Sequence, residues 1–399
     1  MKLSFVSDIS LDSELRYVRG LISGFRNIDR RDEITIYVRK DRKEEKVPGA
    51  VVKKTWSQLR FPFQIVKSAI RDRQNVVHVL YDTPTFGLVN TPILLPLLFL
   101  FLRISHKYAS VTIHAVPPVF TQKDMKTMTD LLKMRSMNVP SGLIKLGVLF
   151  TFTLVGLFAQ RIVVHTPTLK NWLVSDYKIP ESKIVVIPHG SNIPSIVAIE
   201  KVVPPINLGD RKFVLYFGRL NPRKGIELLL LSWSKIFSKY PEYLLVIAGT
   251  IYRFDISGQY YTSLKKLSSD LGTDQSVIFS GRLPDEQVEW LYLKSEFVVL
   301  PYQFSNAASG PLAIAISFGK PVIASSIGAF NDEIINNING LLVRQGDELD
   351  LRRALESMIG DQNLRARLKK NAKEMIRNRT WNDHAKSLES IWSERKNYS

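Results

Sequence analysis

The chain has 399 residues, 45% hydrophobic and 23% charged, a composition of soluble globular proteins that excludes collagen, wholesale disorder and a polytopic membrane protein. It contains no cysteine, which excludes disulfides, thiol nucleophiles and Cys-ligated metal centres. Its 55 basic and 37 acidic residues give a net charge of +18, which favours anionic partners such as nucleic acid, an acidic membrane surface or phosphorylated small molecules.

The first half of the chain predicts short strands that alternate with helices. A helix is expected over 12–25, where apolar residues recur at helical spacing. Strands are expected at 3–6, 33–38, 76–80, 111–114, 161–165 and 184–187. Short apolar strands separated by helical stretches are typical of a parallel sheet covered by helices on both faces.

The same pattern restarts after a Pro-rich stretch, 194–205, that we interpret as a linker. Strands are expected at 212–217, 243–248, 276–279, 297–300 and 321–324, and helices at 225–239, 261–271, 284–294 and 311–318. The sequence thus predicts two doubly wound α/β domains, 1–195 and 206–380, and a C-terminal helix in 381–399. Ligands of such folds bind beyond the carboxyl ends of the strands, here in the cleft between the domains.

Two segments, 93–102 and 146–159, are unusually apolar but shorter than the roughly 20 residues of a transmembrane helix. They are buried core helices or segments that contact a membrane surface. Basic residues surround them: Arg103, Lys107, Lys123, Lys126, Lys133 and Arg135. These cations favour binding of the two segments to an anionic bilayer surface.

The most informative segment is 218–225, GRLNPRKG, between a strand and a helix. Arg219 follows the strand directly, where its guanidinium can bind phosphate oxygens. Lys224 lies five residues later at the helix start, near the positive end of the helix dipole. The pair could bind a diphosphate; the alternative is a solvated basic turn.

A second segment, 306–323, runs NAASGPLAIAISFGKPVI. Its small residues lead into a helix with Pro311 in the first turn. Ser309 and Gly310 would leave the helix N-terminus open for a phosphate. The alternative is an ordinary turn between a strand and a helix.

These two segments, in this order and about 90 residues apart, resemble the family-4 retaining glycosyltransferases, which have the two-lobed GT-B fold. The resemblance implies that the C-terminal helix, 381–399, crosses over and packs back on the first domain. The resemblance extends over roughly residues 160–392 and is only loose before residue 160. Further segments that fit the family are 162–166, 185–190, 246–249, 277–283, 298–301, 332–334 and 339–343.

The resemblance implies a role for each matched position. Arg219 and Lys224 would neutralise the donor diphosphate, with Gly218 in the same loop. Arg282 and Leu283 would lie against the nucleobase. Backbone amides of the second segment would bind the phosphates, from Ser309, Gly310 and Leu312. His114 matches a histidine that faces the transferred sugar, although a core histidine at a strand end is the alternative.

The sequence departs from the family at two glutamate positions, which hold Asn306 and Ile314. Asn306 could hydrogen-bond sugar hydroxyls without charge, whereas Ile314 cannot bind a ribose. This resembles a subgroup with Ser-Gly-Pro-Leu in the loop, here residues 309–312. The glycine-rich turn that often follows the first strand is also absent, since 8–13 reads DISLDS.

The resemblance implies a hexosyltransferase that moves a sugar from a nucleotide-diphosphate donor to a glycan or lipid-linked acceptor with retention of configuration. No metal or other cofactor is expected, because Arg219, Lys224 and a helix N-terminus could absorb the leaving-group charge and the chain has no Asp-x-Asp motif. The alternatives are a sugar-nucleotide epimerase of the same fold and a non-catalytic sugar- or nucleotide-binding relative.

The expected location is the cytoplasm, peripheral on the inner face of the cell membrane. The apolar stretch at residues 1–8 is too short for a secretory signal. An anionic membrane surface is therefore an expected partner. Nucleic acid is not, since no zinc knuckle, RNP-like strand or helix-turn-helix is found.

Overall fold

A computed structural model describes residues 1–9, 12–28, 32–41, 45–82, 92–117, 140–192, 196–249, 258–374 and 379–393. The chain forms two compact units. Unit 1 comprises Met1–Gly190, Asn306–Ala308 and Arg379–Ser399, and unit 2 comprises Ser191–Ser305 and Ser309–Asn378. The basic residues Lys123, Lys126, Lys133 and Arg135 lie outside the described residues.

Unit 1 is built on a seven-stranded parallel sheet in the order β3-β2-β1-β4-β5-β6-β7. Its strands are β1 (Lys2–Val6), β2 (Glu33–Arg39), β3 (Val51–Trp56), β4 (Val76–Tyr81), β5 (Tyr108–Ile113), β6 (Arg161–Val164) and β7 (Ile184–Val186). The central strands β4 and β5 are buried along their whole length. Burial on both faces explains why they are continuous apolar runs instead of alternating ones.

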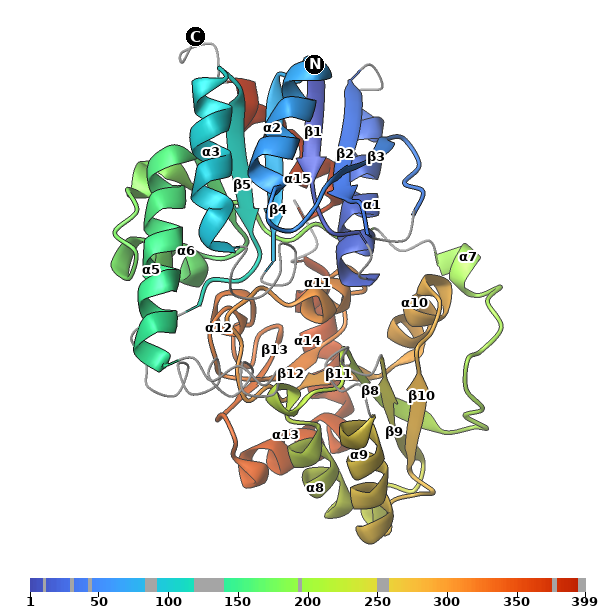
Figure 1. Cartoon of the computed structure of the whole chain (residues 1–399). Helices are drawn as coiled ribbons and strands as arrows, with labels where there is room; N and C mark the ends of the chain where they lie inside the picture. Colours follow the sequence, from blue (N-terminus) through green and yellow to red (C-terminus); the bar gives the residue numbers. More distant parts are fainter. Residues whose placement is uncertain are drawn as a thin grey trace. The chain divides into compact units, whose positions relative to one another are not determined.

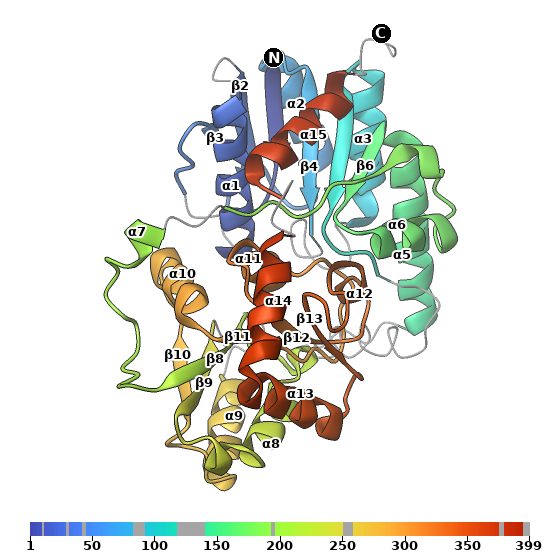
Figure 2. The ribbon, with the colours of Figure 1, turned by 180° about the vertical axis from the view of Figure 1, so that it is seen from behind.

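Helices cover both faces of this sheet. One face carries α2 (Phe61–Arg71), α3 (Leu95–Ile104), α5 (Ser141–Phe158) and α6 (Pro167–Ser175) (Figure 1). The opposite face carries α1 (Asp12–Ile28) and the C-terminal α15 (Trp381–Ser393), which lie side by side (Figure 2). The last helix of the chain therefore belongs to the first unit.

The contact between α1 and α15 is close because α1 presents glycines to it. A Cβ on Gly20 would lie 2.2 Å from the Trp381 ring. Further along, Trp392 stacks on Phe25 with ring centroids 5.6 Å apart, and its indole N–H donates to Ser110 Oγ at 3.0 Å. The α15 helix is thus fixed to unit 1 by two buried tryptophans.

Unit 2 has a six-stranded parallel sheet in the order β10-β9-β8-β11-β12-β13. Its strands are β8 (Lys212–Phe217), β9 (Tyr243–Ala248), β10 (Val277–Gly281), β11 (Phe297–Leu300), β12 (Val322–Ser325) and β13 (Gly340–Val343). Its helices are α7 (Ile196–Ile199), α8 (Ile226–Ser234), α9 (Gln259–Asp270), α10 (Asp285–Lys294), α11 (Gly310–Ser317), α12 (Phe330–Glu333), α13 (Glu348–Gly360) and α14 (Gln362–Glu374). Figure 1 shows α8 and α9 over one face of this sheet, and Figure 2 shows α14 over the other.

The α/β prediction of two doubly wound parallel sheets is confirmed. The strands β8, β9 and β11 have the bounds that the sequence predicts. The sequence did not predict β3, α2, α13 or α14. The β3 strand lies at the sheet edge and carries Lys53 and Lys54, so it lacks the continuous apolar run of the central strands.

The two apolar segments form α3 and α5. Both contribute to the unit 1 core, through Leu98 and Phe99 on α3 and Phe152 and Val155 on α5. Among the described residues, no helix combines the length and the apolar character needed to cross a bilayer.

Candidate functional site

The carboxyl ends of β8, β9 and β10 lie side by side at one edge of the unit 2 sheet. The N–H of Gly218 donates to Ala248 O at 3.0 Å, and the N–H of Gly249 donates to Gly281 O at 3.0 Å. A Cβ on Gly249 would lie 1.8 Å from Gly218 O, with Gly249 at φ +144°. Glycine at this position therefore lets the loop that contains Arg219 start directly beside the next strand.

A tight turn places Lys224 beside the end of β11. The Asn221 side-chain oxygen accepts from the N–H of Arg223 at 3.1 Å and caps the short helix 222–224. Gly225 has φ +65°, and a Cβ there would lie 2.0 Å from Pro301 O. The N–H of Gln303 donates to Arg223 O at 2.8 Å. The loops after β8 and β11 are thus joined through their backbones.

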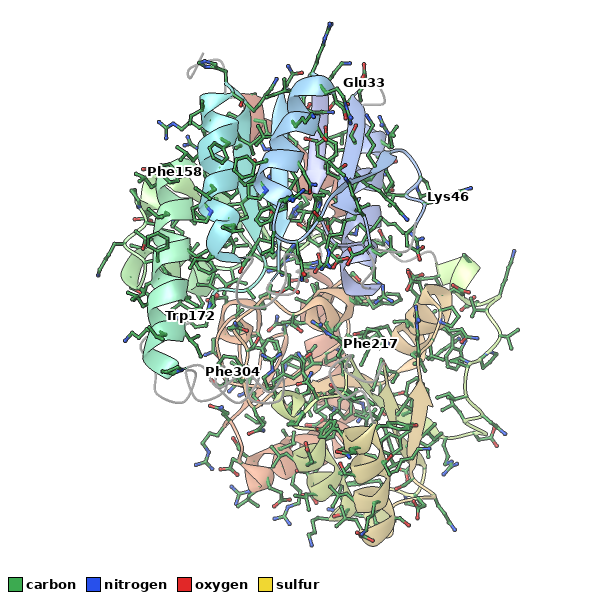
Figure 3. All side chains as sticks on the ribbon, viewed as in Figure 1. Glu33, Lys46, Phe158, Trp172, Phe217 and Phe304 are labelled. Atoms are coloured by element: carbon green, nitrogen blue, oxygen red, sulfur yellow. The ribbon has the colours of Figure 1, made fainter. Side chains whose placement is uncertain are left out.

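Phe217, the last residue of β8, and Phe304, in the loop after β11, are labelled in Figure 3. Phe217 packs edge-on against Tyr292 at 5.6 Å, and the Arg223 guanidinium lies 5.9 Å from the Phe304 ring centroid. The Arg223–Phe304 contact is a cation–π interaction between the basic loop and the loop after β11.

The ammonium group of Lys224 is half-buried and crowded by like charges. It lies 3.5 Å from the centroid of the Tyr302 ring. Burial lowers the pKa of Lys224 well below its ordinary value, and the charges of Arg219 and Arg223 lower it further. An anion bound here would relieve the repulsion among these cations.

The N-terminus of α11 lies next to this loop. A Cβ on Gly218 would lie 3.7 Å from Pro311 Cγ and 3.8 Å from the Tyr302 hydroxyl. Burial raises the pKa of Tyr302 to about 12, against the opposing effects of Ser309 and Arg219. The Tyr302 hydroxyl is buried next to Ser309. The structure thus places a basic loop, a buried hydroxyl and a helix start together within unit 2.

Ser309 acts as the N-cap of α11. Its Oγ accepts from the N–H of Leu312 at 3.3 Å, so this amide is already engaged within the turn. Pro311 has no N–H, and the backbone N–H of Gly310 remains at the helix start. A Cβ on Gly310 would meet nothing within 4 Å, which means that space is open there.

The other matched positions of unit 2 lie at the same sheet edge or in its core. Arg282 follows β10 and is exposed, and Leu283 is partly buried against the core. Ile314 packs partly buried against the same core from α11, which explains an apolar residue at this position.

In unit 1, the structure brings together His114 and Asn306, two predicted catalytic residues far apart in the sequence. His114 directly follows β5. Ala115 and Ala307 form an antiparallel bridge, and the N–H of Val116 donates to Asn306 O at 2.8 Å. The segment 306–308 therefore extends the backbone pairing at the end of β5.

His114 also belongs to a buried cluster around Tyr17, a residue of α1. The Tyr17 ring contacts the rings of five side chains at centroid distances of 4.6–5.9 Å: His114, His165, His189, Trp381 and His384. Burial lowers the pKa of His189 and of His384 to about 4. Within the part of the chain that the structure describes, no three His, Asp or Glu side chains are arranged to hold a metal ion.

Sequence reasoning missed Tyr302 in unit 2 and Tyr17, His165 and His384 in unit 1. Tyr302 and His165 each follow closely after a strand, β11 and β6, and this position was the signal that could have found them. Tyr17 and His384 are on helices, where nothing in the sequence marks them.

Part of the chain matches a family of known function. Residues 199–375 match the family described as Glycosyl transferases group 1. This segment contains the basic loop, Tyr302 and the start of α11, and it excludes most of unit 1.

Curated relatives agree with this match. The chain is 28% identical over 241 residues to a protein of Methanocaldococcus jannaschii named as an uncharacterized glycosyltransferase, covering 58% of the chain and 59% of the relative. It is 27% identical over 249 residues to D-inositol 3-phosphate glycosyltransferase of Corynebacterium kroppenstedtii, covering 59% of the chain and 53% of the relative. The matches thus span little more than half of these relatives.

Solved structures share the fold over the whole chain. Sucrose-phosphate synthase from Thermosynechococcus elongatus has a TM-score of 0.75 at 16% identity and covers 100% of both chains. HepE from Anabaena in complex with UDP has a TM-score of 0.72 at 16% identity, covering 99% of this chain and 100% of that chain. These structures have the GT-B fold, so the fold prediction is confirmed.

Proposed function

We propose that the chain is a glycosyltransferase that moves a hexose from a nucleotide-diphosphate sugar to a glycan or lipid-linked acceptor with retention of configuration. The family match over 199–375 and the UDP complex of HepE support a nucleotide-sugar donor. The observation that carries the proposal is the position of Lys224, a half-buried cation whose pKa is lowered and whose ammonium lies 3.5 Å from the centroid of the Tyr302 ring.

The basic loop suits a diphosphate better than a neutral ligand. Three cations, Arg219, Arg223 and Lys224, are held close enough together to affect the lysine's pKa. Without an anion their mutual repulsion and the burial of Lys224 are unfavourable. The Gly310 amide and the Tyr302 hydroxyl are further donors at the same place.

The same groups account for a reaction without a metal. When the bond from the anomeric carbon to the phosphate oxygen breaks, the electron pair passes to the diphosphate, whose negative charge grows. Lys224 and Arg219 would stabilise that charge directly. The acceptor hydroxyl would attack on the face that the diphosphate leaves, and its proton would pass to the departing phosphate oxygen. His114 and Asn306 of unit 1 are assigned to the sugar, and Arg282 and Leu283 to the nucleobase.

A screen of nucleotide sugars tests this proposal. The protein is incubated with UDP-, GDP- and ADP-sugars and a lipid-linked or glycan acceptor panel, with and without EDTA, and donor consumption is followed by mass spectrometry. Turnover of one donor that persists in EDTA is expected. Tight binding of a nucleoside diphosphate with no turnover of any pair would instead favour a non-catalytic binding relative.

We also propose that unit 1 attaches to an anionic membrane through α2, α3 and α5. These helices pack against one another on one face of the sheet (Figure 1). Their 11, 10 and 18 residues contain no Asp or Glu. Apolar side chains are exposed along them: Phe63, Ile70, Ile104, Leu143, Leu146, Phe150 and Leu157.

The exposed apolar residues of α5 are Leu143, Leu146, Phe150 and Leu157, with spacings of three, four and seven residues. This is the spacing of side chains on one face of a helix, so they form one stripe. Exposed cations on the neighbouring helices are Lys67, Arg71 and Arg103. Apolar insertion combined with charge attraction is the pattern of interfacial helices, and it supports the proposed attachment to the inner face of the membrane.

Vesicle flotation tests this attachment. The protein is expected to float with vesicles that contain anionic lipid, and the double variant Leu146→Glu/Phe150→Glu is expected to stay at the bottom. Val203→Glu, at an exposed apolar residue of unit 2, is the matched control and should float like the wild type. A wild-type protein that fails to float with either anionic or zwitterionic vesicles would refute the attachment.

A further inference from the structure

His114 and His165 occupy equivalent positions at the ends of two neighbouring strands. β5 and β6 are paired in parallel with Thr112 opposite Val163, which brings the two residues that follow these strands to the same sheet edge. Nδ1 of His114 lies 2.9 Å from Nε2 of His165. The two imidazoles are therefore hydrogen-bonded to each other.

The hydrogen bonds determine which nitrogen carries the proton. Nδ1 of His165 lies 2.9 Å from Ile187 O, and a carbonyl oxygen can only accept, so this nitrogen is protonated. An uncharged imidazole has one N–H, and burial keeps both rings uncharged, since the pKa of His114 is lowered to about 3 and that of His165 well below its ordinary value. Nε2 of His165 must then accept from Nδ1 of His114.

This series of hydrogen bonds leaves Nε2 of His114 as an unprotonated acceptor. The atom is buried, and no described residue hydrogen-bonds to it. Tyr17 packs edge-on against the His114 ring at 4.6 Å and 83°, which holds the ring plane. A buried acceptor without a donor costs about 1–3 kcal/mol, so the arrangement favours a ligand that supplies an O–H or N–H.

We propose that His165 is a positioning residue that holds His114 in its Nδ1–H tautomer, so that Nε2 of His114 accepts a hydrogen bond from a hydroxyl of the transferred sugar. The role of His114 toward the sugar rests on the proposed function; the tautomer and its control by His165 do not. An uncharged acceptor suits a neutral sugar hydroxyl, whereas a carboxylate or phosphate at this point would face a lone pair.

Histidine tautomers are measured first, because this needs no substrate. The protein is labelled with ¹⁵N-histidine and two-bond ¹⁵N–¹H correlations are recorded, with His114→Gln used to assign the resonances. His114 is expected to be Nδ1–H in the wild type and to lose that preference in His165→Leu. A wild-type His114 that is Nε2–H would overturn the proposal whatever the enzyme's activity.

A double-mutant cycle then separates positioning from a structural role. His165→Leu is expected to lower kcat/KM roughly tenfold, the value of one lost hydrogen bond, and His165→Gln, which keeps an acceptor, to stay within about threefold of the wild type. In a His114→Leu background the further loss from His165→Leu should disappear. Additive losses would overturn the proposal, whereas a wild type with no turnover of any donor would count against the proposed function alone.

His78→Gln is the matched control for these variants. His78 is buried in the same unit and hydrogen-bonded through both nitrogens, to Ser110 and Thr112, but not to His114. It is expected to lower stability while leaving kcat/KM of the folded protein and the His114 tautomer unchanged. A change of the His114 tautomer in this variant would show that any disturbance of the core suffices, and would overturn a specific role of His165.

Discussion

Replacing Lys224 with methionine should separate binding from folding, because the charge that we propose binds the diphosphate is unfavourable in the unliganded protein. Methionine keeps the length of the side chain against Tyr302 and removes only the ammonium. The ammonium lies 3.5 Å from the ring centroid, where a cation contributes about 0.5–2 kcal/mol. Burial and two nearby arginines oppose this gain, as the lowered pKa of Lys224 shows.

Loss of the contact with the Tyr302 ring and loss of the buried charge change the free energy of unfolding of the unliganded protein in opposite directions. A lysine whose pKa is lower in the folded than in the unfolded state destabilises the fold while it is protonated. Loss of the charge thus offsets loss of the ring contact, and the free energy of unfolding should change by no more than about 1 kcal/mol. In the transition state the charge faces a developing oxyanion, and its loss should lower kcat by about 10²–10³.

The assays are chemical unfolding, calorimetric binding of UDP, GDP and ADP, and initial rates with the donor found in the screen. Lys235→Met, at an exposed lysine of the same unit, controls for the change in net charge and should behave as the wild type in all three. A Lys224→Met protein with full activity would refute the assignment of the site. A large loss of stability in the unliganded variant would refute the reasoning from burial and repulsion.

Three further predictions concern the fold. Burial, above all, lowers the pKa of Lys320 to about 7, so between pH 7 and the ordinary lysine pKa of 10.5 the unfolded chain binds a proton that the folded chain does not. The free energy of unfolding should therefore rise with pH in this window, by up to about 1.4 kcal/mol per pH unit. Urea unfolding of Lys320→Met should lack that rise. Gly225→Ala should destabilise unit 2 and weaken nucleotide binding, because its Cβ would lie 2.0 Å from Pro301 O. Gly272→Ala is the control: with φ +66° and open space around the Cβ, it should lose only the roughly 1–2 kcal/mol of the backbone conformation. Equal losses of stability in the two variants would disprove the steric argument. Trp392→Ala should lower the free energy of unfolding of unit 1 by about 3–5 kcal/mol in thermal or urea unfolding, since it removes the stack on Phe25 and the hydrogen bond to Ser110. A loss under about 1 kcal/mol would show that α15 contributes little to the stability of unit 1.

The amino-acid sequence by itself determined the elements that are buried on both faces and the loops that follow them. The strands β8, β9 and β11 are short runs of apolar residues, and only a strand in the middle of a covered parallel sheet needs such a run. Arg219 and Lys224 could be found because they follow one of these strands and lie near the start of a helix. Elements with weaker patterns, such as the edge strand β3, were missed for the same reason.

Only the tertiary structure decided which of these strand ends and helices meet. Tyr302 faces Lys224 because β11 is the neighbour of β8 in the sheet, although Tyr302 follows Lys224 by 78 positions in the sequence. Tyr17 of α1 and His165, which follows β6, both contact the His114 ring. His384 joins this cluster because α15 returns to unit 1 and brings it against Tyr17 and His165. Local hydrophobic periodicity specifies an element's type and buried face, but the order of strands depends on packing between segments that no local pattern encodes. The return of α15 to the first unit, which the family resemblance implied, likewise depends on packing between distant segments.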